Sequence, residues 1–256
     1  MGYTYRGLLG EIVYAYVSCR VDVSYAVQLM SIFSQAPAEI HFIALKNLCR
    51  YLRATKSDGL IYWRRKPLMG LDRVPLKLIP ADSSLPEFPF VDLLRLVGYI
   101  DAAHATNLWN RKSVSGICFC LAGAAVAYKS KQQATCATSS TEAEFICAVH
   151  AAKIAKWLRA VLYDLGYPQI EPTELHEDNQ ACIAIVNENR PTQRSRHIDI
   201  QHFAIQEWRE QGILTLTFMP GCINPADQST KALTFALHHR HSRRLMGHYG
   251  PGVQSN

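Results

Sequence analysis

The chain has 256 residues with a formal net charge of +6, and 48% of its residues are hydrophobic. That content is enough to bury one large core or two smaller ones. No apolar run approaches the roughly 18 residues of a membrane span, so we expect a soluble protein without a membrane partner. The eight cysteines occur singly, without Cys-x-x-Cys pairs, which argues against a disulfide scaffold and indicates reduced thiols.

The positive charge is concentrated at the front of the chain. Residues 1–66 hold nine Lys and Arg against four Asp and Glu. Lys46, Arg50 and Arg53 share one face of a predicted helix, where they would contact a phosphate backbone or simply face solvent. A basic segment joined to a domain with carboxylates suits a polyanionic substrate handled at an acidic metal site. An ordinary solvated basic surface would explain the charge equally well.

Residues 4–63 are predicted to form a small, mainly helical segment, because apolar residues recur there at helical spacing. The expected elements are helices at 5–17, 22–34 and 37–53 and a short strand at 59–63. Five prolines then interrupt residues 67–95. We interpret that stretch as a linker that contains the domain boundary.

The rest of the chain alternates strand and helix patterns, as an α/β domain does. Expected strands cover 96–102, 116–121, 124–129, 173–177 and 213–219, and the first three are joined as hairpins. Expected helices cover 139–165, 181–186 and 198–211, and another begins at Pro225. Residues 236–256 are rich in His and Arg, show no clear period, and are expected to be a basic tail. The pattern predicts a mixed sheet flanked by helices and preceded by the helical segment.

The long helix at 139–165 begins with a motif that separates two glutamates. Ser139 and Glu142 have the spacing of a capping box, in which each side chain accepts a hydrogen bond from the backbone of the other residue. Glu144 lies about 200° around the helix from Glu142. Because Glu144 is not needed for capping, we expect it to face a functional site.

Four acids lie at the ends of predicted elements: Asp101, Glu144, Asp178 and Asp227. Carboxylates brought together without basic partners repel one another unless hard cations neutralise them. Oxygen ligands favour Mg²⁺ or Mn²⁺ over zinc, and two such ions support phosphodiester hydrolysis. Spacing alone leaves open that these acids are ordinary surface residues.

Several motifs resemble, in order, the ribonuclease H domain of copia-type LTR retrotransposon Pol polyproteins. They are GYIDA at 98–102, NRKSVSG at 110–116, YKSKQQ at 128–133, SSTEAEF at 139–145, EDNQACI at 177–183, RHIDIQHF at 196–203 and NPADQSTKAL at 224–233. The stretches YRGLLGEIVYAYVSCRVDVSYAV and HFIALKNLCRYLRATKSDGLIY resemble the end of the reverse transcriptase of the same polyprotein. The resemblance assigns residues 1–66 to a thumb or connection-like segment and 96–235 to a ribonuclease H-like domain.

The resemblance implies a metal-dependent endonuclease that cuts the RNA strand of RNA–DNA hybrids during reverse transcription. Asp101, Glu144, Asp178 and Asp227 match the family's catalytic carboxylates, which hold two Mg²⁺ or Mn²⁺ ions. Shape and 2′-hydroxyls, not sequence, would identify the RNA strand. Candidate hybrid contacts are Arg111, Lys112, Lys129, Lys131, Gln132, Ser140, Asn179 and Gln180. The implied partners are the hybrid and the polymerase portion of the polyprotein, and the implied location is the cytoplasmic particle of the element, or the nucleus.

The chain departs from the family in ways that keep alternatives open. Asp101-Ala-Ala-His104 stands where Asp-Ala-Asp-Trp is usual, and the loop 220–224 contains no histidine. No Tyr-x-Asp-Asp motif occurs, so we expect no DNA synthesis. One alternative is a catalytically silent, nucleic-acid-binding remnant. Another is a nuclease of the same fold that cuts DNA duplexes.

Four further residues receive structural interpretations. We expect Glu177 to face solvent, because neighbouring residues of a strand point to opposite sides. His202 is expected on a helix surface, and Trp157 and Trp208 in core or edge packing.

Overall fold

A computed structural model describes residues 4–63, 94–107, 109–187 and 196–248. The predicted linker lies outside these residues, apart from its last two positions. No helix in the described part of the chain is long and apolar enough to cross a membrane.

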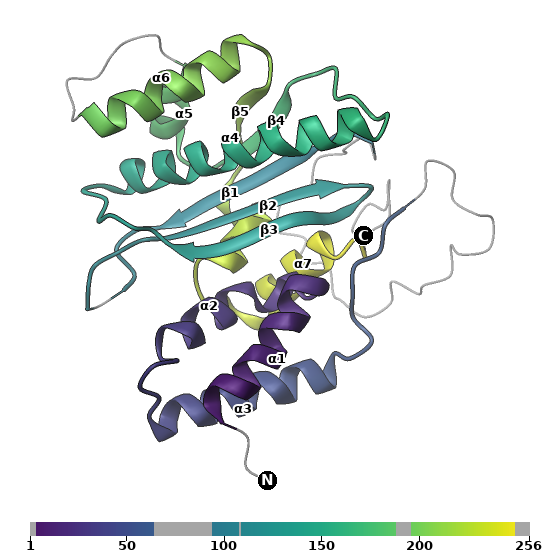
Figure 1. Cartoon of the computed structure of the whole chain (residues 1–256), viewed down its shortest axis with the longest axis vertical. Coiled ribbons are helices and arrows are strands. Elements are labelled where there is room, and N and C mark those ends of the chain that lie inside the picture. The colour runs from purple at the N-terminus through teal and green to yellow at the C-terminus, as the bar shows by residue number, and fades with distance from the viewer. Residues whose placement is uncertain (1–3, 64–93, 108, 188–195, 249–256) are drawn as a thin grey trace.

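A mixed five-stranded sheet forms the centre of the molecule (Figure 1). Its strands are β1 (Val97–Ala103), β2 (Val114–Leu121), β3 (Ala124–Gln132), β4 (Thr173–Glu177) and β5 (Leu214–Phe218). They lie in the order β3-β2-β1-β4-β5, with β1–β2 and β2–β3 antiparallel and β1–β4 and β4–β5 parallel. The carboxyl ends of β1, β4 and β5 therefore meet at one edge, where open α/β sheets place their functional sites.

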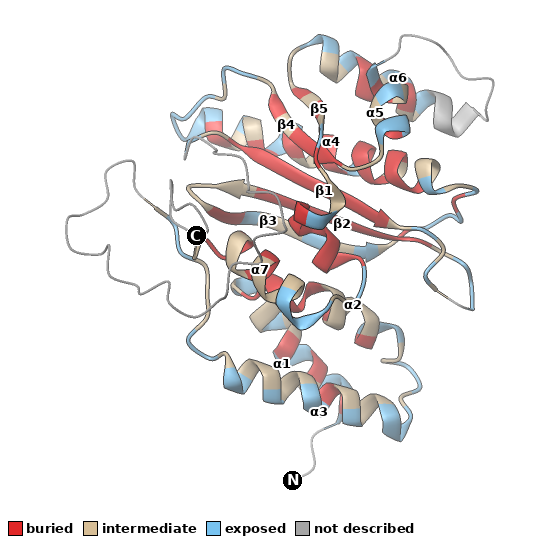
Figure 2. Cartoon of the chain, turned by 180° about the vertical axis from the view of Figure 1, so that it is seen from behind, coloured by how far each residue is buried: buried red, intermediate tan, exposed pale blue. Residues whose placement is uncertain are grey.

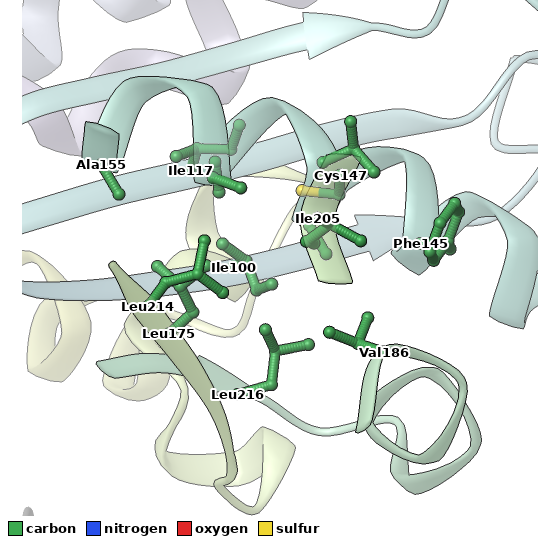
Figure 3. Packing of buried hydrophobic residues seen from close by; sticks show 14 of the residues in the cluster. Ile100, Ile117, Phe145, Cys147, Ala155, Leu175, Val186, Ile205, Leu214 and Leu216 are labelled. Atoms are coloured by element: carbon green, nitrogen blue, oxygen red, sulfur yellow. The ribbon is translucent and has the colours of Figure 1, made fainter. Parts of the chain in front are cut away.

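Three helices cover one face of the sheet: α4 (Ser140–Asp164), α5 (Gln180–Asn187) and α6 (Arg196–Glu210) (Figure 1). Alternate strand residues point toward α4 and build the largest core, since side chains of a strand alternate between its faces. Figure 3 draws 14 side chains of this core, from strands and helices, and labels Ile100, Ile117, Phe145, Cys147, Ala155, Leu175, Val186, Ile205, Leu214 and Leu216.

The opposite face packs on α7 (Phe235–Leu245) and on the short 3₁₀ helices η2 (Gly221–Ile223) and η3 (Pro225–Ser229). Leu245 and Met246 are buried there beside Tyr99. The stretch expected to be a basic tail without a clear period thus begins with a helix that the sequence analysis did not predict. Most residues of α7 are His or Arg. Too few apolar residues remain in this helix to show a helical repeat in the sequence. A 3₁₀ helix also stands where an α-helix was expected from Pro225.

The N-terminal segment is helical, as predicted, with α1 (Tyr5–Ser18), η1 (Val21–Val23), α2 (Ser24–Ile32) and α3 (Glu39–Ala54). The segment has a hydrophobic core of its own. It also contains a buried ion pair, in which Arg20 lies 2.7 Å from Asp22. Tyr51 of α3 donates a 2.7 Å hydrogen bond to the same carboxylate. The predicted strand at 59–63 is wrong, because no strand forms there. Instead, the backbone N–H of Ile61 donates to Met246 O at 2.8 Å.

The helical segment packs under the sheet, against η3 and α7 (Figures 1 and 2). The hydroxyls of Ser24 and Ser229 lie 2.9 Å apart, and His238 Nε2 lies 2.9 Å from the Asp22 carbonyl oxygen. The architecture expected from the sequence, a mixed sheet with flanking helices after a helical segment, is confirmed.

Gly116 of β2 is the point at which η3 approaches the sheet most closely. A Cβ there would lie 2.6 Å from Thr230 Cγ2 and 2.8 Å from the Ala226 carbonyl oxygen. Because backbone cannot yield as a flexible side chain can, we predict that Gly116→Ala lowers the free energy of unfolding by about 1–3 kcal/mol. Urea-induced unfolding measures this change.

The matched control is Gly10→Ala on the exposed face of α1, where a Cβ meets nothing within 4 Å. That substitution should leave stability unchanged or raise it by roughly 0.5–1 kcal/mol through helix propensity. Equal stability of the two variants would contradict the close approach of η3.

Candidate metal centre

Three of the four predicted carboxylates converge at the edge where β1 and β4 end. Asp101, Glu144 and Asp178 each place one carboxylate oxygen so that all three oxygens lie within 4.8 Å of one another. We call these three residues the acidic cluster. They come from a strand, a helix and a strand-to-helix junction, so the convergence depends on the tertiary fold.

The start of α4 separates Glu142 from Glu144. Ser139 is the N-cap, and its hydroxyl accepts a 3.2 Å hydrogen bond from Glu142 N. The reciprocal bond differs from the predicted capping box, because Glu142 Oε2 accepts from Thr138 N at 2.7 Å instead of from Ser139 N. Either bond occupies Glu142 at the helix terminus. Glu144 takes no part in capping and lies in the interior, with only 4% of the residue exposed.

Asp101 is fixed by the segment that follows β5. The Thr230 hydroxyl donates to Asp101 Oδ2. Asn224 caps η3 by accepting from Ala226 N at 3.1 Å, and its side-chain amide donates to the Ile100 carbonyl at 2.7 Å. The motif NPADQSTK thus ties η3 to the strand that carries Asp101.

Asp227 is buried beside the acidic cluster but is not one of its three converging members. Its Oδ1 forms an ion pair with Lys231, one helical turn further along the chain. Lys231 was not singled out from the sequence. The i,i+4 spacing of the two residues was the available signal.

Asp178 lies directly after β4, over Gly221. A Cβ on Gly221 would lie 2.6 Å from Asp178 Oδ2, so glycine leaves the room in which this carboxylate sits. The next residue, Asn179, caps α5 by accepting from Cys182 N at 3.0 Å. The chain turn between β4 and α5 therefore sets the position of Asp178.

Glu177 is a fifth carboxylate that the sequence interpretation misplaced. It is 0% exposed, so the expectation that it faces solvent is wrong. Its Oε1 accepts a 2.9 Å bond from Asn179 N. Leu175, two residues earlier, points into the core under α4, and the strand alternation that was used to place Glu177 outside directs it to that same face.

Burial and mutual repulsion hold protons on these acids. Burial, reinforced by Asp227, raises the pKa of Asp101 to about 7. Burial, reinforced by Glu177 and Asp101, raises the pKa of Glu144 to about 11, and burial raises the pKa of Glu177 to about 8. Burial also raises the pKa of Asp178. Without a cation the site is therefore partly protonated at neutral pH.

The donor set fits a hard divalent cation. Glu144 Oε2 and Glu177 Oε2 are buried oxygens without a hydrogen-bond partner among the described residues. Every ligand atom in the acidic cluster is a carboxylate oxygen, which Mg²⁺ and Mn²⁺ prefer. Binding such an ion would relieve the repulsion and satisfy the unpaired oxygens.

The predicted nucleic-acid contacts lie on different parts of the sheet domain. Lys129 and Lys131 are exposed on β3, where their charges act on His150 of α4. Gln132 points to the other face of the sheet, toward Asn110, and Arg111 and Lys112 follow in that loop. Ser140 and Gln180 are exposed, whereas Asn179 is already engaged as a helix cap.

Other expectations had mixed outcomes. His104 replaces the usual tryptophan and lies 3.1 Å from the Ala137 carbonyl oxygen, so it packs the loop before α4. His202 is buried, not on the helix surface as expected, and packs against Phe145. Trp208 packs on the main core, as predicted, but Trp157 is 62% exposed, so its expected packing role is wrong.

Comparisons with known proteins place the chain among transposon proteins. No family model matches it. The retrovirus-related Pol polyprotein from transposon TNT 1-94 of Nicotiana tabacum is 31% identical over 229 residues, which cover 90% of this chain and 15% of that protein. This chain thus corresponds to a small part of that polyprotein.

A shorter relative and a solved structure also match. Secreted RxLR effector protein 161 of Plasmopara viticola is 34% identical over 154 residues, which cover 60% of this chain and 90% of that protein. The crystal structure of LC11-RNase H1 in complex with an RNA/DNA hybrid aligns with a TM-score of 0.41 and 14% identity, over 53% of this chain and 94% of that one.

The raised carboxyl pKa values predict how metal-free stability depends on pH. Asp101 and Glu177 titrate near 7 and 8 in the folded state, far above their ordinary values of 3.8 and 4.5. Between about pH 6.5 and 8 the folded state therefore binds more protons than the unfolded state, and stability falls as pH rises. We expect a loss of about 1 kcal/mol or more per pH unit, measured by unfolding in chelator. Saturating Mg²⁺ should reduce this dependence of stability on pH.

The window begins at pH 6.5 because buried His241, with its pKa lowered to about 3, gives the opposite slope below that value. Asp101→Asn should reduce the slope, whereas Asp164→Asn, at the exposed end of α4, should leave it unchanged. Stability that is flat or rising over this window would contradict the protonated cluster.

Proposed function

The chain belongs to the retrovirus-related Pol polyproteins of copia-type transposons, and we propose that its sheet domain is a ribonuclease H. Its reaction would be hydrolysis of the RNA strand of RNA–DNA hybrids during reverse transcription, with two Mg²⁺ or Mn²⁺ ions. The observation that carries this proposal is the convergence of Asp101, Glu144 and Asp178 at the edge of the sheet. A site built only from carboxylates suits metal-assisted phosphodiester cleavage.

Each residue of the acidic cluster has a distinct role in this proposal. Divalent ions bound there would activate water and stabilise the leaving oxygen. Asp101 presents its carboxylate in the orientation set by Thr230. Asp178 extends over Gly221 from the more open side, since it is only half-buried. Glu144 closes the site on the α4 side, where burial excludes water.

Asp227 is proposed as the fourth ligand. Its carboxylate is held by Lys231, whose side chain is 48% exposed and therefore free to move toward solvent. If the Lys231 side chain moves away, the Asp227 carboxylate beside Asp101 becomes available to a cation. Lys231 would thus neutralise Asp227 in the metal-free state of the protein.

The protein would recognise the hybrid through the sugar–phosphate backbone and the shape of the duplex. Arg111, Lys112, Lys129 and Lys131 would contact phosphates from two sides of the sheet, and the amide and hydroxyl residues Gln132, Ser140 and Gln180 would hydrogen-bond to the backbone. The polymerase portion of the polyprotein is the proposed protein partner, and the cytoplasmic particle, or the nucleus, the proposed location.

A second candidate is a catalytically silent, hybrid-binding protein. The observation that favours it is the Asp227–Lys231 ion pair, which removes one of four carboxylates from the metal centre. If Lys231 stays in place, the protein would bind nucleic acid through its basic residues without cutting it.

Cleavage of a labelled RNA–DNA hybrid tests the proposal. We predict Mg²⁺- or Mn²⁺-dependent cutting of the RNA strand alone, with none in chelator and none of a DNA duplex. Asp101→Asn and Asp178→Asn should each lower the rate at least on the order of 100-fold, about 2.7 kcal/mol of transition-state stabilisation, because each removes a proposed ligand charge.

Glu174→Gln is the control, because Glu174 lies on β4 but pairs with Arg95 on the other face of the sheet. It should cleave like the unmodified protein. Hybrid binding without metal-dependent cleavage by the folded protein would favour the silent alternative, and cutting of DNA duplexes would indicate the DNA nuclease. Normal cleavage by both Asp variants would refute the assigned site.

The lysines of β3 provide a separate test of hybrid binding. If Lys129 and Lys131 contact phosphates, replacing each with Ala should reduce the slope of log affinity against log salt by about 1, because fewer counterions are released. Fluorescence anisotropy of a labelled hybrid in chelator measures this slope. Lys56→Ala, in the exposed turn after α3, is the control, and a slope equally reduced in that variant would indicate diffuse attraction only.

A further inference from the structure

We propose that Glu177 is an additional carboxylate of the metal centre, which strengthens divalent cation binding by its charge while it fixes the turn that carries Asp178. This inference rests on the proposed function, because it concerns the same cation. It goes further, because Glu177 is not among the four predicted ligands or the three converging ones.

The backbone of Glu177 is fixed by the sheet. It is the last residue of β4, and Met219 N donates to its carbonyl oxygen at 2.8 Å. Thr173, Leu175 and Glu177 alternate with Glu174 and His176, so their side chains share a face. Leu175 packs in the core beneath α4, and the Glu177 side chain therefore enters the interior next to the helix that carries Glu144.

The two oxygens of Glu177 have different surroundings. Oε1 accepts the 2.9 Å hydrogen bond from Asn179 N, which is a structural contact. Oε2 is fully buried and has no partner among the described residues. A carboxyl oxygen left unpaired in the interior is unfavourable, so a turn-stabilising role accounts for only half of this side chain.

The unpaired oxygen belongs to the surroundings of the acidic cluster. The charge of Glu177 is the largest electrostatic influence on Glu144, after the effect of burial. Glu144 also has a buried oxygen, Oε2, without a partner. Asp178 is the adjacent residue in the chain. Glu144, a member of the acidic cluster, and Glu177 thus each keep one unpaired carboxyl oxygen in this interior. A divalent cation held by the cluster would compensate both, and Glu177 would contribute charge whether or not it touches the ion.

Glu177→Gln separates the structural role from the electrostatic one. The amide oxygen of Gln can still accept from Asn179 N, so the turn and the α5 cap remain supported. The group that would carry a negative charge beside a bound cation is lost. If Glu177 acts only as a turn residue, metal binding stays unchanged; if it supports the cation, binding weakens.

The test is calorimetric titration of the folded, nucleic-acid-free protein with Mn²⁺. We expect Glu177→Gln to weaken Mn²⁺ binding roughly 10-fold, with a matching decrease in the Mn²⁺-induced rise in melting temperature. Glu177→Asp keeps the charge and should retain most of the affinity. Glu174→Gln should bind like the unmodified protein, and Asp101→Asn should bind least.

Affinity of Glu177→Gln equal to that of the unmodified protein would overturn the inference, and so would an unmodified protein that binds no Mn²⁺. Circular dichroism tests whether each variant is folded. If Glu177→Gln does not fold, Glu177→Asp decides, because a loss of Mn²⁺ affinity with the charge retained would contradict a role by charge. Mn²⁺ binding that depends on Glu177, without hybrid cleavage, would refute the nuclease and leave the inference intact.

Discussion

Repulsion among carboxylates buried at one edge of the sheet is the constraint on which the surrounding structure depends. Buried charges of like sign are costly, and flexible side chains would separate if the backbone allowed it. Here the backbone does not allow it, because Asp101 lies within a central strand paired on both sides and Glu144 lies on a helix packed against the main core. The fold thus holds carboxylates whose mutual repulsion is unfavourable and which a cation would neutralise, in line with the trade-off between stability and function at functional sites.

The elements beneath the sheet fix the site from the other side. Asn224 and Thr230 tie the η3 segment to β1, and Gly116 allows its close approach. Ser229 of η3 in turn contacts Ser24 of the helical segment. The N-terminal helices therefore support the wall of the site, although none of their residues belongs to the acidic cluster. A substitution in that segment can reach the site through η3 without a change in any carboxylate.

The sequence predicted the parts of this arrangement that have a local signal. Strand and helix order followed from periodicity, and Glu144 was separated from Glu142 by its position on the helix. Helix α7 was missed because tertiary burial, not a visible apolar repeat, stabilises it. Glu177 was misplaced because alternation shows only that Glu177 and His176 face opposite sides, and the side that α4 covers is known only from the fold.

Lys231 shows why the acids alone do not define the charge of the site. Its ammonium group pairs with Asp227, and its charge also acts on Asp101 and Asp178. It stabilises the metal-free state on the η3 side, whereas Glu144 and Glu177 keep unpaired oxygens on the α4 side. The carboxyl oxygens without a partner therefore lie on the side of the cluster that faces α4. A cation entering the cluster would meet unpaired oxygens at Glu144 and Glu177, whereas at Asp227 it would have to displace the ammonium group of Lys231. Participation of the fourth carboxylate therefore depends on movement of Lys231.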